Sequence, residues 1–130
     1  MKKLAISLLV ILTLVILFCS LPMQSFADQS WAIGEWKLVQ YFTQDNGSEV
    51  TFNGRLRIFR EQGRFAGSIY FDAVGNWEPL KHIEVSEETI IFTRSTYEQR
   101  FYGHRHGDKM NGTYKDKIHK GEWKWRAEKE

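Results

Sequence analysis

Cysteine is almost absent from this 130-residue chain, and the only one, Cys19, lies in an apolar segment near the N-terminus. A single cysteine cannot form an internal disulfide, and removal of that segment would leave no thiol either. The folded domain must therefore be stabilised by burying apolar side chains. Residues 28–130 supply five Trp, five Tyr and seven Phe for this, each able to bury about 150–250 Å².

An excess of one charge is also missing. The chain has 18 Lys and Arg against 16 Asp and Glu, and two of the basic residues, Lys2 and Lys3, belong to the N-terminal segment. Residues 28–130 thus carry 16 charges of each sign and no net charge. Nucleic-acid binding loses its compositional support, because affinity for phosphates depends on a basic excess that releases counterions.

The N-terminus does contain a long hydrophobic run. Two lysines precede an almost unbroken apolar stretch over 4–21, and residues 25–27, Ser-Phe-Ala, form a small-x-small cleavage site. This order is typical of a secretory signal peptide. We therefore predict a signal peptide over 1–27, a mature domain over 28–130, and a secreted or cell-envelope location.

Two alternatives for this segment stay open. The almost unbroken apolar run over 4–21 has 18 residues, enough to span a bilayer as an uncleaved anchor, which would tether the domain to the membrane. Cys19 also raises the possibility of a lipoprotein cysteine, although Phe18 before it is bulky for such a signal.

Helical periodicity is missing after residue 28, where apolar and polar residues instead alternate between turn residues such as Asn46-Gly47. Eight runs show this pattern: 34–42, 50–60, 64–71, 77–85, 89–96, 98–106, 109–116 and 121–127. Their spacing and hairpin-length links predict an all-β, eight-stranded antiparallel up-and-down barrel. Pro79 has no N–H group, so we expect a bulge or bend in the fourth strand there. Gly34-Glu35-Trp36 and Gly121-Glu122-Trp123 begin the first and last strands, which we expect to meet.

Gly34-Glu35-Trp36 at the head of the first strand resembles the Gly-x-Trp signature of the calycins, the lipocalin and avidin superfamily of barrels. The resemblance implies that Trp36 closes one end of the barrel and that an arginine from a late strand, Arg105 or Arg126, packs across it. The polar set with which avidins hold biotin is not visible in residues 38–41, so biotin binding is not implied.

A strict meander places the remaining inward side chains at two ends. Trp31 and Ile33 are expected to plug the end that holds Trp36. The opposite end would be an open mouth with an apolar, aromatic wall and a few polar groups, which is typical of a small-molecule pocket. Its predicted residues are Gln40, Phe42, Phe52, Phe71, Trp77, Arg94, Gln99, Tyr114 and Trp123.

Arg94 is the main candidate for ligand binding, because a desolvated guanidinium needs an anion or several acceptors. With Gln40 and Gln99 it would hold an acidic ligand group. The alternative is a structural arginine bonded to carbonyls, to Gln99 or to a glutamate. Trp77, Tyr114 and Trp123 would stack on a ligand or belong to the core.

No catalytic constellation is visible in the sequence, and no cofactor is predicted. His104 and His106 share the outer face of one strand, where exposure is a better interpretation than metal binding. Two hypotheses remain. The first is a non-catalytic barrel that binds a small apolar or acidic ligand in its lumen. The second is a protein-interaction barrel with a packed interior, such as an inhibitor of a secreted enzyme.

Overall fold

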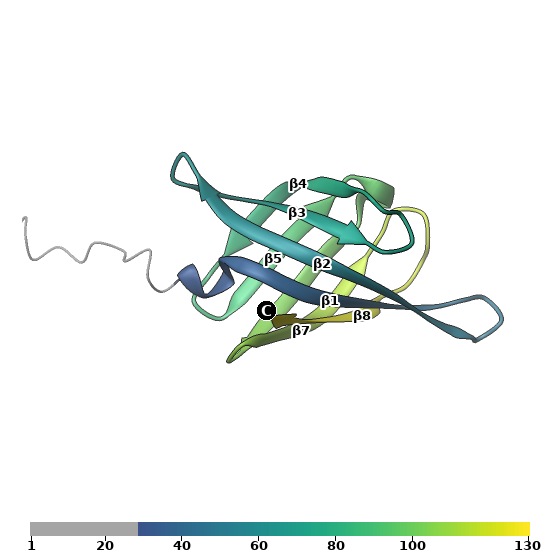
Figure 1. Cartoon of the computed structure of the whole chain (residues 1–130). Helices are drawn as coiled ribbons and strands as arrows, with labels where there is room; N and C mark the ends of the chain where they lie inside the picture. Colours follow the sequence, from purple (N-terminus) through teal and green to yellow (C-terminus); the bar gives the residue numbers. More distant parts are fainter. Residues whose placement is uncertain (1–28) are drawn as a thin grey trace, which may run out of the picture.

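A computed structural model describes residues 29–130 as a single β-barrel (Figure 1). The predicted signal peptide, its cleavage site and the alternatives to it lie outside these described residues. Between residues 29 and 130, no helix is long and apolar enough to cross a membrane.

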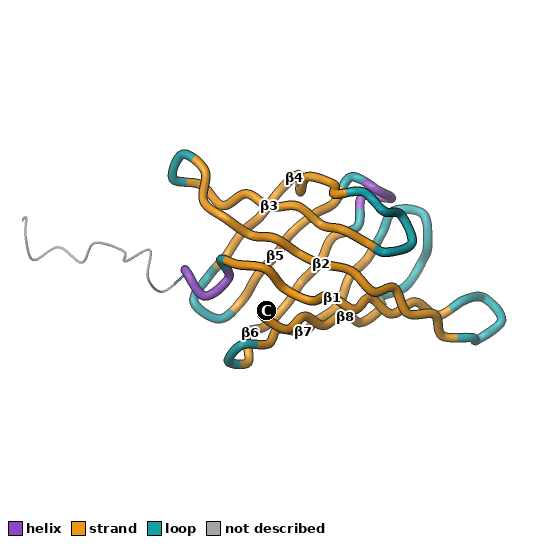
Figure 2. The backbone as a smooth tube through the Cα atoms, viewed as in Figure 1, coloured by secondary structure: helices purple, strands orange, loops and turns teal. Residues whose placement is uncertain are grey.

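Eight antiparallel strands follow one another around the barrel, and the last pairs with the first (Figure 2). The strands are β1 Gly34–Thr43, β2 Glu49–Glu61, β3 Arg64–Phe71, β4 Trp77–Val85, β5 Thr89–Arg94, β6 Arg100–His106, β7 Lys109–Lys115 and β8 Trp123–Lys129. Two 3₁₀ segments accompany them, η2 Ser30–Ala32 and η3 Thr96–Glu98. The prediction of a closed eight-stranded up-and-down barrel is confirmed. The strand ends differ around η3, which occupies residues that we had expected to extend the fifth and sixth strands.

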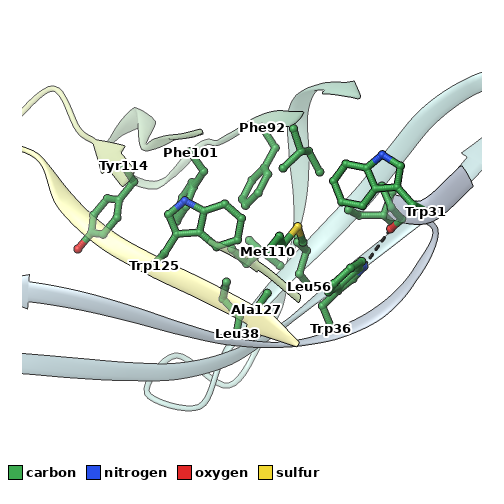
Figure 3. Packing of buried hydrophobic residues seen from close by; sticks show 14 of the residues in the cluster. Trp31, Trp36, Leu38, Leu56, Phe92, Phe101, Met110, Tyr114, Trp125 and Ala127 are labelled. Carbon is green, nitrogen blue, oxygen red and sulfur yellow. Dashed lines mark hydrogen bonds between the residues drawn. The ribbon is translucent and has the colours of Figure 1, made fainter. Parts of the chain in front are cut away.

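Inward side chains fill most of the lumen, as the alternation of apolar residues predicted. Phe92 and Phe101 stack with ring centroids 4.6 Å apart, and Trp125 meets both rings edge-on (Figure 3). Gly103 makes room for this indole, because a Cβ there would lie 2.5 Å from Cζ2 of Trp125. The middle of the barrel is therefore a packed core.

One end of the barrel, called the closed end here, is plugged by η2. The Trp31 ring lies edge-on to Trp36 at 6.3 Å and donates from Nε1 to the carbonyl of Ser86. Trp36 donates from Nε1 to the carbonyl of Ala32 at 2.9 Å (Figure 3). Both indoles thus bury their rings while satisfying their N–H groups, and the predicted plug is confirmed for Trp31.

The cation expected over Trp36 is a different residue. Arg105 lies over Trp31, 5.5 Å from its ring centroid, and Arg126 is exposed on the outer face. Lys129 takes the place over Trp36, because β8 runs further than predicted and pairs Trp36 with Lys129. Gly34 beside it has a positive φ of 138°, and a Cβ there would lie 3.0 Å from Cε of Lys129.

A β-bulge in β4 sets which side chains of this strand face inward. Leu80 pairs with Arg94 but His82 pairs with Thr93, so Lys81 is an extra residue. The bulge lies two residues beyond Pro79, where a break was expected. On the C-terminal side of the bulge, the odd-numbered residues Ile83 and Val85 face inward. On its N-terminal side, the even-numbered residues Glu78 and Leu80 face inward instead. This phase change determines the composition of the open end.

Candidate functional site

A cavity of about 370 Å³ opens at the end of the barrel opposite to Trp36, which we call the mouth. Seven of the nine residues predicted for the mouth line it: Gln40, Phe42, Phe52, Phe71, Arg94, Gln99 and Tyr114. Six further residues complete the lining: Ala73, Val74, Thr96, Tyr97, Asp116 and His119. The aromatic wall with a few polar groups that we expected is therefore present.

Arg94 lies on the floor of the cavity with only 6% of its surface exposed. Its Nε and Nη2 both donate to Oε2 of Glu78, at 3.1 and 2.9 Å, and its Nη1 donates to Oε1 of Gln99 at 3.2 Å. The guanidinium also stacks over the Phe71 ring at 4.7 Å. This is the arrangement that we had considered as the structural alternative, an arginine bonded to Gln99 and a glutamate.

Glu78 is held in place from the other side by Thr96. The Thr96 amide donates to Oε1 at 2.8 Å, and its hydroxyl lies within 3.1 Å of both carboxylate oxygens. Partial burial opposes ionisation of Glu78, but the bonds from Thr96 and Arg94 outweigh it and hold the pKa of this carboxyl below its ordinary value. The pair is therefore a guanidinium and a carboxylate with no net charge.

The polar floor continues from Arg94 across the barrel. Gln40 donates from Nε2 to Oε1 of Gln99 at 3.1 Å, and the Tyr114 hydroxyl donates to the carbonyl of Tyr41. Burial raises the pKa of Tyr114 to about 12, although a hydrogen bond with Gln40 opposes the rise. The floor is thus a connected set of hydrogen bonds beneath aromatic walls.

Trp77 does not lie at the mouth, so its predicted place there is wrong. Its ring lies outside the barrel, 38% exposed, against Tyr70 and under the guanidinium of Arg57 at 4.3 Å. Counting back from Val85 in steps of two places Trp77 inward, but the bulge at Lys81 reverses this. Glu78, which the sequence reasoning missed, faces inward instead.

Trp123 lies at the rim behind the cavity wall. It packs against Phe42 at 4.8 Å and Tyr114 at 5.7 Å, and it does not itself line the cavity. Its contact with two lining residues makes it a natural fluorescent reporter of the mouth.

The rim contains a second hydrogen-bonded pair, Asp116 and His119, that the sequence did not suggest. His119 Nδ1 lies 3.0 Å from Oδ2 of Asp116, whose other oxygen accepts from the amides of Ile118 and His119. Burial of Asp116 works against its ionisation, but these bonds prevail and keep its pKa below the ordinary value. The His119 ring meets Phe42 edge-on at 5.3 Å. Only the i, i+3 spacing of Asp116 and His119 could have indicated this pair.

Backbone geometry at η3 fixes the rest of the rim. Tyr97 and Glu98 have positive φ angles of 53° and 47°, which non-glycine residues rarely adopt. Glu98 accepts ion pairs from Lys81 and Lys117, both at 3.2 Å, and the Lys117 amide donates to the carbonyl of Tyr97. These contacts hold the Tyr97 ring at the cavity opening, where it is half exposed.

His104 and His106 are exposed on the outer face of β6. In residues 29–130, no group of three His, Cys, Asp or Glu side chains could hold a metal ion.

Comparisons with protein-family models, with curated proteins and with solved structures give no match for this chain. The resemblance to calycins therefore stays a prediction, based on Gly34, Trp36 and the strand pattern.

Proposed function

We propose that this protein is an exported, non-catalytic barrel that binds one small, largely apolar molecule in its mouth. The observation that carries the proposal is the cavity of about 370 Å³ above a packed core. At about 30 Å³ per water-sized group, this space suits a ligand of roughly a dozen non-hydrogen atoms. Concave sites with apolar walls and a few fixed polar groups are the usual form of small-ligand sites.

The walls favour an apolar body for the ligand. Phe42, Phe52 and Phe71 line the cavity, and Tyr97 and Val74 stand at its opening with 52% and 61% of their surfaces exposed. Apolar surface at these positions is stabilised when a ligand removes it from water, by about 25 cal/mol per Å². An acidic ligand, the other part of the sequence hypothesis, has weaker support, because Arg94 already has Glu78 as its carboxylate.

Tryptophan fluorescence tests this proposal. Apolar and acidic aromatic compounds of about this size would be titrated into wild-type protein and into Trp123→Phe and Trp77→Phe variants. We expect saturable quenching that Trp123→Phe reduces and Trp77→Phe retains, because Trp123 contacts two lining residues of the cavity and Trp77 lies on the outer face. Quenching that depends on Trp77 alone would place binding on the outer face and contradict the proposal.

A second candidate, a protein-interaction barrel such as an inhibitor of a secreted enzyme, has one specific observation in its favour. Trp77, Tyr70 and Arg57 form a stacked cluster on the outer face. Trp, Tyr and Arg are the residue types that dominate binding energy at protein interfaces. Inhibition of a secreted hydrolase that Trp77→Ala abolishes would support this candidate, and inhibition that survives Trp77→Ala would contradict it.

A further inference from the structure

The directions of the hydrogen bonds on the cavity floor can be assigned from chemistry. A guanidinium donates and never accepts, so the Gln99 atom that faces Arg94 Nη1 must be the carbonyl oxygen Oε1. This fixes the amide of Gln99, with its oxygen on the Arg94 side. Glu78 in turn fixes Arg94 through two bonds to one oxygen.

The Gln99 Oε1 oxygen also determines the orientation of the Gln40 side-chain amide. Because Gln99 Oε1 accepts, the Gln40 atom that meets it at 3.1 Å must be the donor Nε2. The Tyr114 hydroxyl gives its single proton to the carbonyl of Tyr41, so towards Gln40 it can only accept. Both protons of Gln40 Nε2 thus have acceptors, one on Gln99 and one on Tyr114.

One hydrogen-bond donor and one acceptor on these two glutamines have no partner in the described part of the chain. Neither Nε2 of Gln99 nor Oε1 of Gln40 has a hydrogen-bond partner among residues 29–130. The same residues contain no fully buried polar side-chain atom without a partner, so neither group is closed off from solvent, and both residues line the cavity. The floor therefore presents a donor and an acceptor on two neighbouring, bonded amides.

From this arrangement we infer that the ligand has a neutral, planar polar group with an acceptor beside a donor, namely a carboxamide or lactam, at the end that enters first. The ligand carbonyl accepts from Gln99 Nε2, and its N–H donates to Gln40 Oε1. This inference deepens the proposed function and depends on it.

Other polar groups fit the floor less well. A carboxylate has no proton for Gln40 Oε1 and lies near Glu78, whose charge offsets that of Arg94. A ketone satisfies Gln99 but leaves Gln40 Oε1 desolvated, which costs free energy that a second hydrogen bond would recover. An ammonium group would approach the guanidinium of Arg94.

Three compounds of nearly equal size and shape separate these cases: hydrocinnamamide, hydrocinnamate and benzylacetone. Binding to the wild-type protein would be measured by calorimetry. We expect the amide to bind about tenfold more tightly than the acid or the ketone. Gln40→Met should lower the affinity for the amide to that for the ketone without weakening the ketone. Gln99→Met should weaken the amide and the ketone alike, because both carbonyls accept from Gln99 Nε2. Trp77→Phe, on the outer face of the barrel, is the control and should keep the preference.

A readout on the wild-type protein covers the case in which a variant does not fold. The side-chain amide resonances of Gln99 in NMR spectra should shift with hydrocinnamamide and remain in place with benzylacetone-sized hydrocarbons. Equal affinities for the three compounds, or tightest binding of the acid, would overturn the inference and leave the proposed function standing. Absence of saturable binding by all three and by the wider panel would remove the proposed function as well.

Discussion

Arg94 and Glu78 form a two-bond ion pair in which Nε and Nη2 donate to the same oxygen, at 3.1 and 2.9 Å. The pair joins β5 to β4, and the arginine and glutamate side chains are 7% and 21% exposed. Removing one member of a pair with so little contact with water lowers the stability of the fold, because the remaining charge stays buried without a partner.

Glu78→Gln should therefore lower the free energy of unfolding by about 1–3 kcal/mol, measured by urea denaturation. Glu98→Gln is the matched control, because Glu98 pairs with Lys81 on the outside, where both side chains are more than 40% exposed. An exposed pair of this kind contributes little to stability, because water and salt screen it. Equal losses in the two variants would show that Arg94 is compensated in some other way.

The same pair predicts a pH dependence. The pKa of Glu78 is lower in the folded protein than its ordinary value of 4.5, so its contribution to stability is complete above that pH and is lost as the pH falls through the folded value. The stability difference between wild type and Glu78→Gln should shrink on acidification from neutral pH to below pH 4.5. Urea denaturation of both proteins at the two pH values measures it, and a difference that stays constant would contradict the assignment.

Tyr114 predicts the opposite dependence at alkaline pH. Its pKa rises from 10.0 to about 12 on folding, mainly through burial, so its contribution is complete below pH 10 and is lost as the pH rises through the folded value. In an absorbance titration of tyrosinate, Tyr114→Phe should lose the component near pH 12. The variant should also be less stable at neutral pH by about 1 kcal/mol, because the Tyr41 carbonyl loses its donor. A component near pH 12 that survives in Tyr114→Phe would belong to another tyrosine.

Gly103→Ala should lower the free energy of unfolding by about 1–3 kcal/mol, because the added methyl group would overlap the buried Trp125 ring. The ring packs edge-on against the stacked rings of Phe92 and Phe101 and cannot shift without disturbing them. A double-mutant cycle tests the cause: in a Trp125→Phe background the same substitution should cost less. Equal costs in the two backgrounds would assign the effect to the backbone.

Lys129→Met should lower the free energy of unfolding by about 1–2 kcal/mol, because the ammonium group donates to the Trp31 carbonyl at 2.9 Å and lies 5.4 Å from the Trp36 ring. Lys124→Met, on the exposed outer side of the same strand, is the control and should change little. Thermal unfolding followed by circular dichroism compares the two. A loss of the same size in both variants would mean that Lys129 has no special part in closing the barrel.

The alternation of apolar residues was sufficient to predict the closed barrel, its two ends and most of the mouth. It succeeded because a side chain in a strand has only two directions, and the core fixes which one is inward. Gln40 and Arg94 face inward because β1 and β5 keep this alternation without interruption. Gln99 is extended between η3 and β6 and continues the inward phase of Phe101.

The alternation could not predict Glu78, Asp116 or His119. The even-numbered Glu78 faces inward because of the bulge at Lys81. Pro79 indicated a break nearby but not which residue would be the extra one. Asp116 and His119 lie beyond the end of β7, where no periodicity applies. Their place at the rim depends on contacts with Phe42 and Tyr97, residues distant in the chain.

The bulge at Lys81 divides β4 into two parts that differ in which side chains face the lumen. Residues after it present odd-numbered side chains to the lumen, and residues before it present even-numbered ones. Lys81 is the extra residue between these two sets, and its exposed side chain pairs with Glu98. Deletion of Lys81 would make His82 follow Leu80 directly, as the pairing of Arg94 and Thr93 opposite them allows. The strand would then alternate regularly with Leu80 and Glu78 still facing inward, so we expect Arg94 to keep its partner.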